Sequence, residues 1–126
     1  MQNRAARFGP AAMATAAANL LNCAITSMTG TTGFASPTTA TLALYIILTH
    51  LRIVNTAAAA ATVSTFIGTT ATSATAAAFA FNGYSIAANS YVDWYGRVRL
   101  DAADYLTGIA SAVTCVWQAE GEIGLL

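Results

Sequence analysis

The side chains that could do chemistry in this chain are few, and His50 comes first because it is the only histidine. It falls on the polar side of a segment in which polar and apolar residues alternate. Nucleophilic catalysis pairs a histidine with a serine or cysteine, and no such partner stands at a recognisable spacing. We therefore interpret His50 as a surface or subunit-contact residue.

Acidic residues are the next candidates, because paired carboxylates hydrolyse glycosidic bonds. The chain contains Asp93, Asp101, Asp104, Glu120 and Glu122. Asp101 and Asp104 flank a predicted turn, where aspartate commonly binds local backbone groups. A calcium site at these two residues is the alternative, although the spacing of an EF-hand is absent.

Glu120 and Glu122 lie two positions apart and therefore on one face of a predicted strand. We expect them to discourage edge pairing or to meet Arg97 and Arg99 across the sheet. The chain has no motif typical of phosphate-binding, zinc-protease or serine-hydrolase sites. We predict that the protein is not an enzyme and has no metal site and no cofactor.

The two cysteines, Cys23 and Cys115, show neither a CxxC pattern nor the spacing of metal ligands. Cys115 stands in an alternating segment, where a small buried apolar residue is the simplest interpretation. We expect both thiols to be free. A lipoprotein signal ending at Cys23 is an alternative, but the preceding Asn22 is not the small residue that we expect at such a cleavage site.

Tyr91, Trp94 and Tyr95 form an aromatic cluster close to Arg97, and such a cluster could bind a sugar by stacking. The same spacing is typical of a core tryptophan flanked by two tyrosines in a subunit contact. Tyrosine, tryptophan and arginine are enriched at protein interfaces, so we favour the interface over the carbohydrate site.

Composition limits the classes of partner. The 126 residues include five arginines, no lysine and five acidic residues, so the net charge is zero. A neutral chain with so few charges favours association with other protein. It lacks the cationic surface that nucleic-acid binding needs, and no apolar run is long enough for a membrane-spanning helix. We expect neither nucleic acid nor membrane as a partner.

From residue 41 onward, apolar residues recur at every second position, which predicts β-strands. Strands are expected over residues 45–56, 62–68, 78–81, 91–95, 97–101, 105–109 and 113–123, with a loop over residues 69–77. Short strands separated by turns are typical of an antiparallel sandwich or barrel. We predict an all-β, jelly-roll-like antiparallel sandwich domain over residues 41–126. Its expected core contains Leu51, Ile53, Val63, Trp94, Val98, Leu100, Val113 and Trp117.

Residues 1–40 lack this alternation. Pro10 through Ile25 favour a helix by composition, and glycines and a proline interrupt regular structure after Thr29. We expect an irregular or partly helical N-terminal arm over residues 1–40 that becomes ordered only on a neighbouring subunit.

Two patterns give residues 41–124 a family likeness. One is His50-Leu51-Arg52-Ile53-Val54-Asn55-Thr56 followed by an alanine run, Thr62-Val63 and Phe66-Ile67-Gly68. The other is Ser85-Ile86-Ala87-Ala88-Asn89-Ser90, with a last strand ending Glu120-Gly121-Glu122-Ile123-Gly124. In these strand ends and turns the chain resembles the small β-sandwich virion proteins of tailed bacteriophages, such as decoration (cement), head-fibre or neck-associated components.

The resemblance implies a virion structural protein, and a capsid decoration protein that binds and stabilises the assembled head is the leading hypothesis. Its partners would be the phage major capsid protein or other virion proteins, and copies of itself, with a homotrimer favoured. A carbohydrate-binding head-fibre, neck or tail module that adheres to host surface glycans is the alternative. The interface residues that we expect are Arg4, Arg7, Phe8, Tyr45, His50, Arg52, Tyr91, Tyr95 and Arg97.

Overall fold

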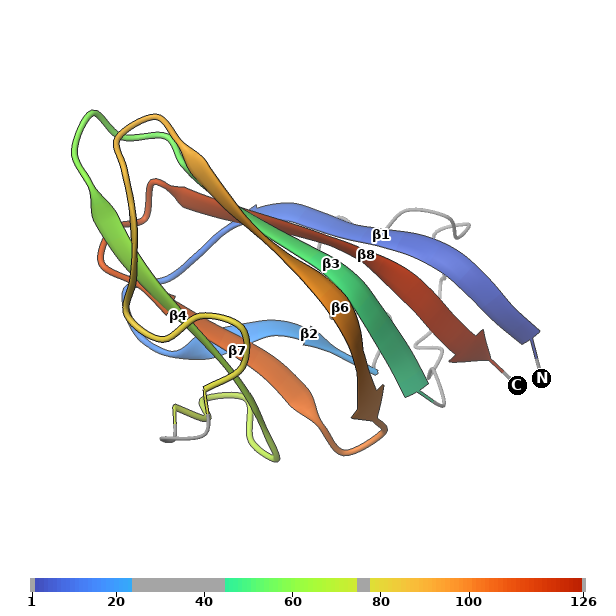
Figure 1. Cartoon of the computed structure of the whole chain (residues 1–126). Helices are drawn as coiled ribbons and strands as arrows, with labels where there is room; N and C mark the ends of the chain where they lie inside the picture. Colours follow the sequence, from blue (N-terminus) through green and yellow to red (C-terminus); the bar gives the residue numbers. More distant parts are fainter. Residues whose placement is uncertain (1, 24–44, 75–77, 126) are drawn as a thin grey trace.

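The computed structural model describes residues 2–23, 45–74 and 78–125, and its regular elements are all β-strands. They are β1 (Gln2–Ala12), β2 (Ala18–Asn22), β3 (Tyr45–Asn55), β4 (Ala61–Gly68), β5 (Tyr84–Ile86), β6 (Tyr91–Asp101), β7 (Tyr105–Ala110) and β8 (Cys115–Leu125). Two antiparallel sheets of four strands have the orders β1-β8-β3-β6 and β2-β7-β4-β5 (Figure 1). The predicted all-β sandwich is confirmed. In the described part of the chain, no helix suited to crossing a membrane is found.

The core lies between the sheets, because each strand turns every second side chain inward. Five predicted core residues are buried, namely Leu51, Ile53, Val63, Leu100 and Trp117, while Trp94 and Val98 are partly buried against that core. The prediction for Val113 is wrong, since this side chain is 64% exposed. Residues 111–114 form bends and turns, and the inward alternation begins only with β8 at Cys115.

The N-terminal segment belongs to the sandwich, which corrects the predicted arm. β1 pairs with β8 at the edge of one sheet, and β2 pairs with β7 at the edge of the other. Phe8 and Leu21 are fully buried, so the two strands bring large apolar side chains to the core. The expected helix is wrong over residues 10–22, because pairing with distant strands overrides the helix propensity of alanine. The rest of the predicted arm, residues 24–40, lies outside the described residues.

The strand that we expected over residues 78–81 is reduced to a single bridge between Phe66 and Ala78. Ala80 has a φ of 64°, in the left-handed region, so extended alternation stops there. The backbone nevertheless pairs with β4. The N–H of Phe79 donates to the carbonyl oxygen of Thr65 at 2.7 Å, and the N–H of Thr65 donates to the carbonyl oxygen of Phe81 at 2.9 Å. This segment therefore continues the edge of the sheet beyond β5.

β3 changes register against both of its neighbours between Leu48 and His50. Its inward positions are even-numbered before this point and odd-numbered after it. Thr49 occupies the irregularity, and its Oγ1 donates to the carbonyl oxygen of Glu120 at 3.2 Å. The shift places His50 and Arg52 on the outer face of the sheet while the core alternation continues.

Asn55 ends β3 with a fully buried side chain. Its Nδ2 donates to the carbonyl oxygens of Ala59 at 2.8 Å and Ile86 at 3.2 Å, and its Oδ1 accepts from the N–H of Ala57 at 3.1 Å. The backbone N–H of Asn55 donates to the carbonyl oxygen of Ser90 at 2.8 Å. One residue thus joins the loop after β3 to the turn that leads from β5 into β6.

We predict that Asn55→Ala lowers the free energy of unfolding by about 2–4 kcal/mol, because buried carbonyl and N–H groups lose their partners. Urea unfolding followed by tryptophan fluorescence measures this change. Asn89→Gly is the matched control in the facing turn. Asn89 has a φ of 52°, which glycine adopts without strain, so the expected change is below about 1 kcal/mol. Equal losses in the two variants would contradict a special role for the Asn55 amide.

Candidate functional site

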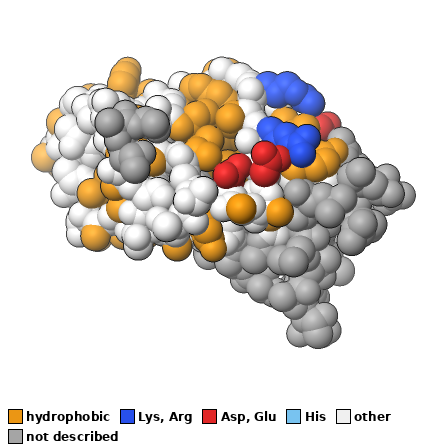
Figure 2. Space-filling view, turned by 90° about the horizontal axis from the view of Figure 1, so that it is seen from below, with side chains coloured by type: hydrophobic (Ala, Val, Ile, Leu, Met, Phe, Trp, Pro, Cys, Tyr) orange, Lys and Arg blue, Asp and Glu red, His pale blue; other side chains and the backbone are white. Residues whose placement is uncertain are grey.

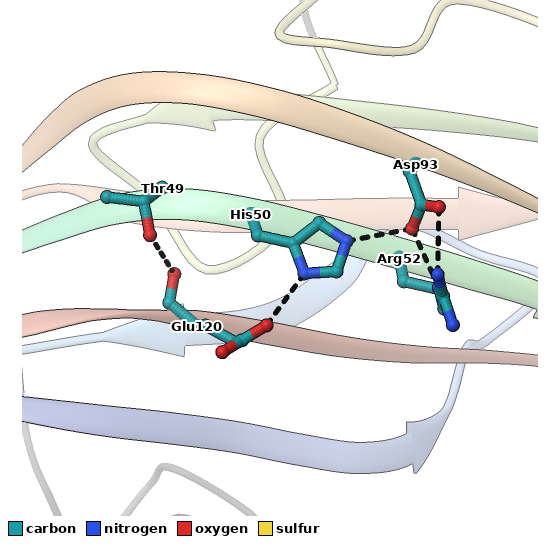
Figure 3. A network of polar contacts seen from close by, with 5 residues as sticks. All are labelled: Thr49, His50, Arg52, Asp93 and Glu120. Atoms are coloured by element: carbon teal, nitrogen blue, oxygen red, sulfur yellow. Dashed lines mark hydrogen bonds and ion pairs between the residues drawn. The ribbon is translucent and has the colours of Figure 1, made fainter.

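A network of polar side chains lies on the outer face of the sheet β1-β8-β3-β6 (Figure 3). The register sets His50 of β3 beside Tyr95 of β6 and Glu120 of β8. It also sets Arg52 beside Asp93. Because β3 lies between β6 and β8, His50 meets acidic residues that are 43 and 70 positions away in the sequence.

His50 is held between two carboxylates. Its Nε2 lies 2.8 Å from Asp93 Oδ1, and its Nδ1 lies 3.0 Å from Glu120 Oε1. Only an imidazolium has an N–H on both nitrogens, so the protonated ring alone can donate to both carboxylates at once. The ring also stacks on Tyr95, with centroids 4.5 Å apart and 6° between the planes. These contacts fix the orientation of both rings.

Arg52 and Asp93 form a two-bond ion pair beside His50. Arg52 Nε donates to Asp93 Oδ1 at 2.7 Å, and Nη2 donates to Oδ2 at 2.9 Å, which is the planar geometry that arginine and carboxylate prefer. The hydrogen bonds from Arg52, and to a smaller extent the one from His50, hold the pKa of Asp93 below its usual value. The Arg52 guanidinium lies 4.3 Å from the centroid of the Tyr91 ring. The network therefore fixes both tyrosines of β6.

The geometry of the network does not provide a metal site. The imidazole stands between its two carboxylates, so the three groups cannot converge on one ion. Among residues 2–23, 45–74 and 78–125, no group of three or more His, Cys, Asp or Glu side chains is placed to hold a metal. The face instead presents tyrosine, arginine and carboxylate groups that are already held by their neighbours.

The structure brings several predicted interface residues together on this one sheet. His50, Arg52, Tyr91 and Tyr95 contact one another through the network. Tyr45 lies farther along β3, with the Arg99 guanidinium 4.7 Å from its ring centroid.

The remaining predicted interface residues lie elsewhere in the same sheet. Arg7 is exposed in β1 opposite Glu120, and Arg97 is exposed in β6. The backbone of Arg4 faces Ile123 in the pairing of β1 with β8. Phe8 is a correction, because its side chain is fully buried and belongs to the core rather than to a contact surface.

The expected partners of the acidic residues need a second correction. Glu120 was expected to meet Arg97 or Arg99, but β3 separates β8 from β6, and Glu120 bonds to His50 instead. Arg99 Nε donates to Asp101 Oδ1 on its own strand at 2.6 Å.

Two sequence interpretations are confirmed locally. Asp104 Oδ2 accepts from the backbone N–H of Asp101 at 2.8 Å, which is the turn role that we expected for this pair. Cys23 and Cys115 are free and buried, and burial raises the pKa of the Cys23 thiol to about 11.

The aromatic cluster is divided between two faces of β6. Trp94 turns inward, where the ring of Phe79 meets it edge-on with centroids 4.7 Å apart. Tyr91 and Tyr95 remain 56% and 69% exposed on the outer face. The sugar-stacking platform of three aromatic residues that we considered from sequence is therefore not assembled on one surface.

A pocket of about 220 Å³ lies apart from the network, where residues of β4 and β7 meet Thr15. Two serine hydroxyl groups in the wall of this pocket accept hydrogen bonds from backbone N–H groups. Ser111 Oγ accepts from the N–H of Thr62 at 2.9 Å, and Ser64 Oγ accepts from the N–H of Gly83 at 2.7 Å. These two hydroxyl groups therefore stabilise the local backbone structure.

The chain has no match among family models, curated proteins or solved structures.

We predict that Asp93 titrates below the usual aspartate value near 3.9 and that Arg52→Gln raises its pKa. Carbon-detected NMR of the Asp93 carboxyl group during an acid titration measures both values. Arg97→Gln is the matched control, because Arg97 is an exposed arginine of the same strand as Asp93. An unchanged Asp93 pKa in Arg52→Gln would show that the ion pair does not set it.

The same shift fixes the sign of a stability change with pH. The pKa of Asp93 in the folded protein is depressed, so the contribution of this carboxylate to the free energy of unfolding is fully present above the unfolded pKa of about 3.9. It is lost as the pH falls through the folded pKa. Urea unfolding at a series of pH values should therefore show a smaller acid-induced loss in Asp93→Asn than in the unaltered protein, and equal losses would contradict this.

Proposed function

We propose that this protein is a bacteriophage virion structural protein, a capsid decoration (cement) protein that binds the assembled head through the outer face of the sheet β1-β8-β3-β6. One observation carries the proposal. On this face, two largely exposed tyrosines are held in position by an interlocked set of charged side chains.

Such a face is suited to binding protein. Arg52 covers one side of the Tyr91 ring, and His50 covers one side of the Tyr95 ring. Side chains that are fixed before binding lose little conformational entropy when a partner arrives. Tyrosine and arginine are also the residue types that dominate binding energy at protein interfaces.

The strand order supports a jelly-roll arrangement of the sandwich. The chain moves from one sheet to the other at nearly every connection, so β1, β3, β6 and β8 form one sheet and β2, β4, β5 and β7 form the other. Viral capsid domains and lectins both use this architecture. Because one fold can host many functions, the choice between a capsid-binding and a sugar-binding protein depends on the residues of the outer face.

The scarcity of charged residues supports a partner contact made by burial of apolar and aromatic surface. Only 8% of the residues are charged, and the net charge is zero. Figure 2 shows a face on which the charged side chains gather in one area, while hydrophobic side chains, other uncharged side chains and backbone occupy the rest of the described part of that face. A protein of this kind would stabilise the head by bridging neighbouring capsid subunits, through surface burial rather than long-range attraction.

A glycan-binding module remains the second candidate, because exposed Tyr91 and Tyr95 lie beside the hydrogen-bonding groups of Arg52 and Asp93. Sugar sites combine such aromatic rings with polar groups. Against it, one side of each ring is already covered within the protein.

Heads of the parent phage that lack this protein provide the test. We predict that the purified protein binds them at symmetric lattice positions, visible by cryo-electron microscopy. Tyr95→Ala should weaken this binding about 30-fold or more, as expected for a central interface tyrosine. Tyr84→Ala is the matched control, since Tyr84 is 50% exposed but lies on β5 of the other sheet.

Failure of the unaltered protein to bind heads would refute the decoration role. Equal binding of Tyr95→Ala and Tyr84→Ala would show that a different surface contacts the head. Binding on a glycan array that Tyr95→Ala abolishes would favour the second candidate.

A further inference from the structure

β6 is an unusually open edge strand. It runs for 11 residues at the end of the order β1-β8-β3-β6, and within the described ranges it pairs with β3 alone. Its outer side therefore presents a row of backbone N–H and C=O groups, which is a template for pairing with another strand.

The other three edges carry features that limit such pairing. β5 has only three residues, and β2 has five with a register shift against β7. β1 contains Pro10, which has no N–H to donate, and its register shifts between Phe8 and Ala11. β6 shares the register shift, since its pairing with β3 is irregular between Tyr95 and Val98, but it is long, contains no proline and has no charged inward side chain.

The inward side chains of β6 leave apolar surface at this edge. Val92, Trp94 and Val98 are only partly buried although they pack against the core. They alternate with the outward side chains and end with buried Leu100. A strand added beside β6 would cover the exposed part of these three residues.

The outward side chains of β6 are complementary to themselves. If two copies of β6 run antiparallel about Gly96, Asp93 of one faces Arg99 of the other, Tyr95 faces Arg97, and Tyr91 faces Asp101. No like charges are then directly opposed. A pairing centred on Arg97 would set that residue against its own copy and Asp93 against Asp101.

The same centre suits the inner face, and it falls where β6 is irregular in its pairing with β3, between Tyr95 and Val98. It overlaps all 11 residues of β6 and sets Val92 against Leu100 and Trp94 against Val98 of the second copy. Gly96 itself would lie on the two-fold axis. A Cβ at this position would come within 2.6 Å of the Trp94 ring, so glycine leaves room for that ring where two backbones approach.

We propose that two copies of this chain pair through β6 about Gly96, so that two four-stranded sheets become one continuous sheet. This two-fold contact differs from the trimer that the sequence favoured. It does not rest on the proposed role in a virion, because it concerns the isolated protein. The proposed pairing is antiparallel and centred on one residue, so its register can be tested.

Sedimentation of the purified full chain at micromolar concentration should show a dimer. Arg99→Glu replaces two attractive contacts with Asp93 by two repulsive ones and should raise the dimer dissociation constant about 10–100-fold. Arg97→Glu is the matched control on the same strand and face, and it should have a smaller effect because position 97 faces Tyr95. Circular dichroism must show that both variants remain folded.

Thiol cross-linking tests the register. Tyr95→Cys and Arg97→Cys proteins should form a disulfide-linked dimer when they are mixed and oxidised with a copper–phenanthroline catalyst. Neither should do so readily alone, because two like residues would then be diagonal neighbours about 7–8 Å apart, beyond the reach of a disulfide. Cross-linking of Tyr95→Cys with itself would place the centre at residue 95, and self-linking of Arg97→Cys would place it at residue 97; either result overturns the proposed register. A monomer or trimer in sedimentation overturns the pairing itself, and a monomer that still binds heads would overturn it while leaving the decoration role intact.

Discussion

The buried side chain of Asn55 is the constraint on which one end of the sandwich depends. An amide in a dry interior destabilises the fold unless its donors and acceptor are all used. Here they are used by backbone groups on either side of the interior, from the loop after β3 and from the end of β5. The paths of these loops are therefore specified by one residue, and so is the entry into β6, since Ser90 accepts from the backbone of Asn55.

The same connection also involves two sequence patterns, the Asn-Thr end of β3 and the Ala-Asn-Ser turn before β6. Thr56 donates through Oγ1 to the carbonyl oxygen of Thr114 at 2.8 Å, and the N–H of Asn89 donates to the carbonyl oxygen of Ala57 at 2.9 Å. The Asn-Thr strand end and the Ala-Asn-Ser turn are thus two halves of one hydrogen-bonded connection.

Small hydroxyl side chains play a related part on the other sheet. Thr65 and Thr107 are fully buried, and their hydroxyls donate to the carbonyl oxygens of Phe79 and Ser73. These bonds tie the segment after β4 to the sheet at positions where a larger apolar side chain would not reach a backbone group.

The sequence alone predicted those strands in which the alternation of polar and apolar residues matches the burial of their side chains in the structure. Leu51 and Ile53 on β3 and Trp117 on β8 were placed correctly for this reason. β1 was missed because its alanines carry little information about facing, and β2 because its buried leucines, Leu20 and Leu21, are adjacent and do not alternate. The partners of these strands, β8 and β7, also lie far along the chain.

The candidate site was predictable only as a set of separate residues. His50 and the two tyrosines were expected at a surface contact, but the pairing of His50 with Asp93 and Glu120 depends on a strand order that a single sequence does not reveal. The register change at Thr49 also leaves no mark in the residue types. Long-range pairing, rather than local propensity, decides both.

The pairing of the first strand with the last has a consequence for how the chain is made. Within the described residues, β1 hydrogen-bonds to β8 alone, with Gln2 opposite Leu125 at one end of the ladder. A ribosome releases the partner of β1 only when it has finished nearly the whole sequence shown. Until β8 has left the ribosome, the first strand has no partner and Phe8 stays exposed, so the sandwich cannot close before its last strand has emerged.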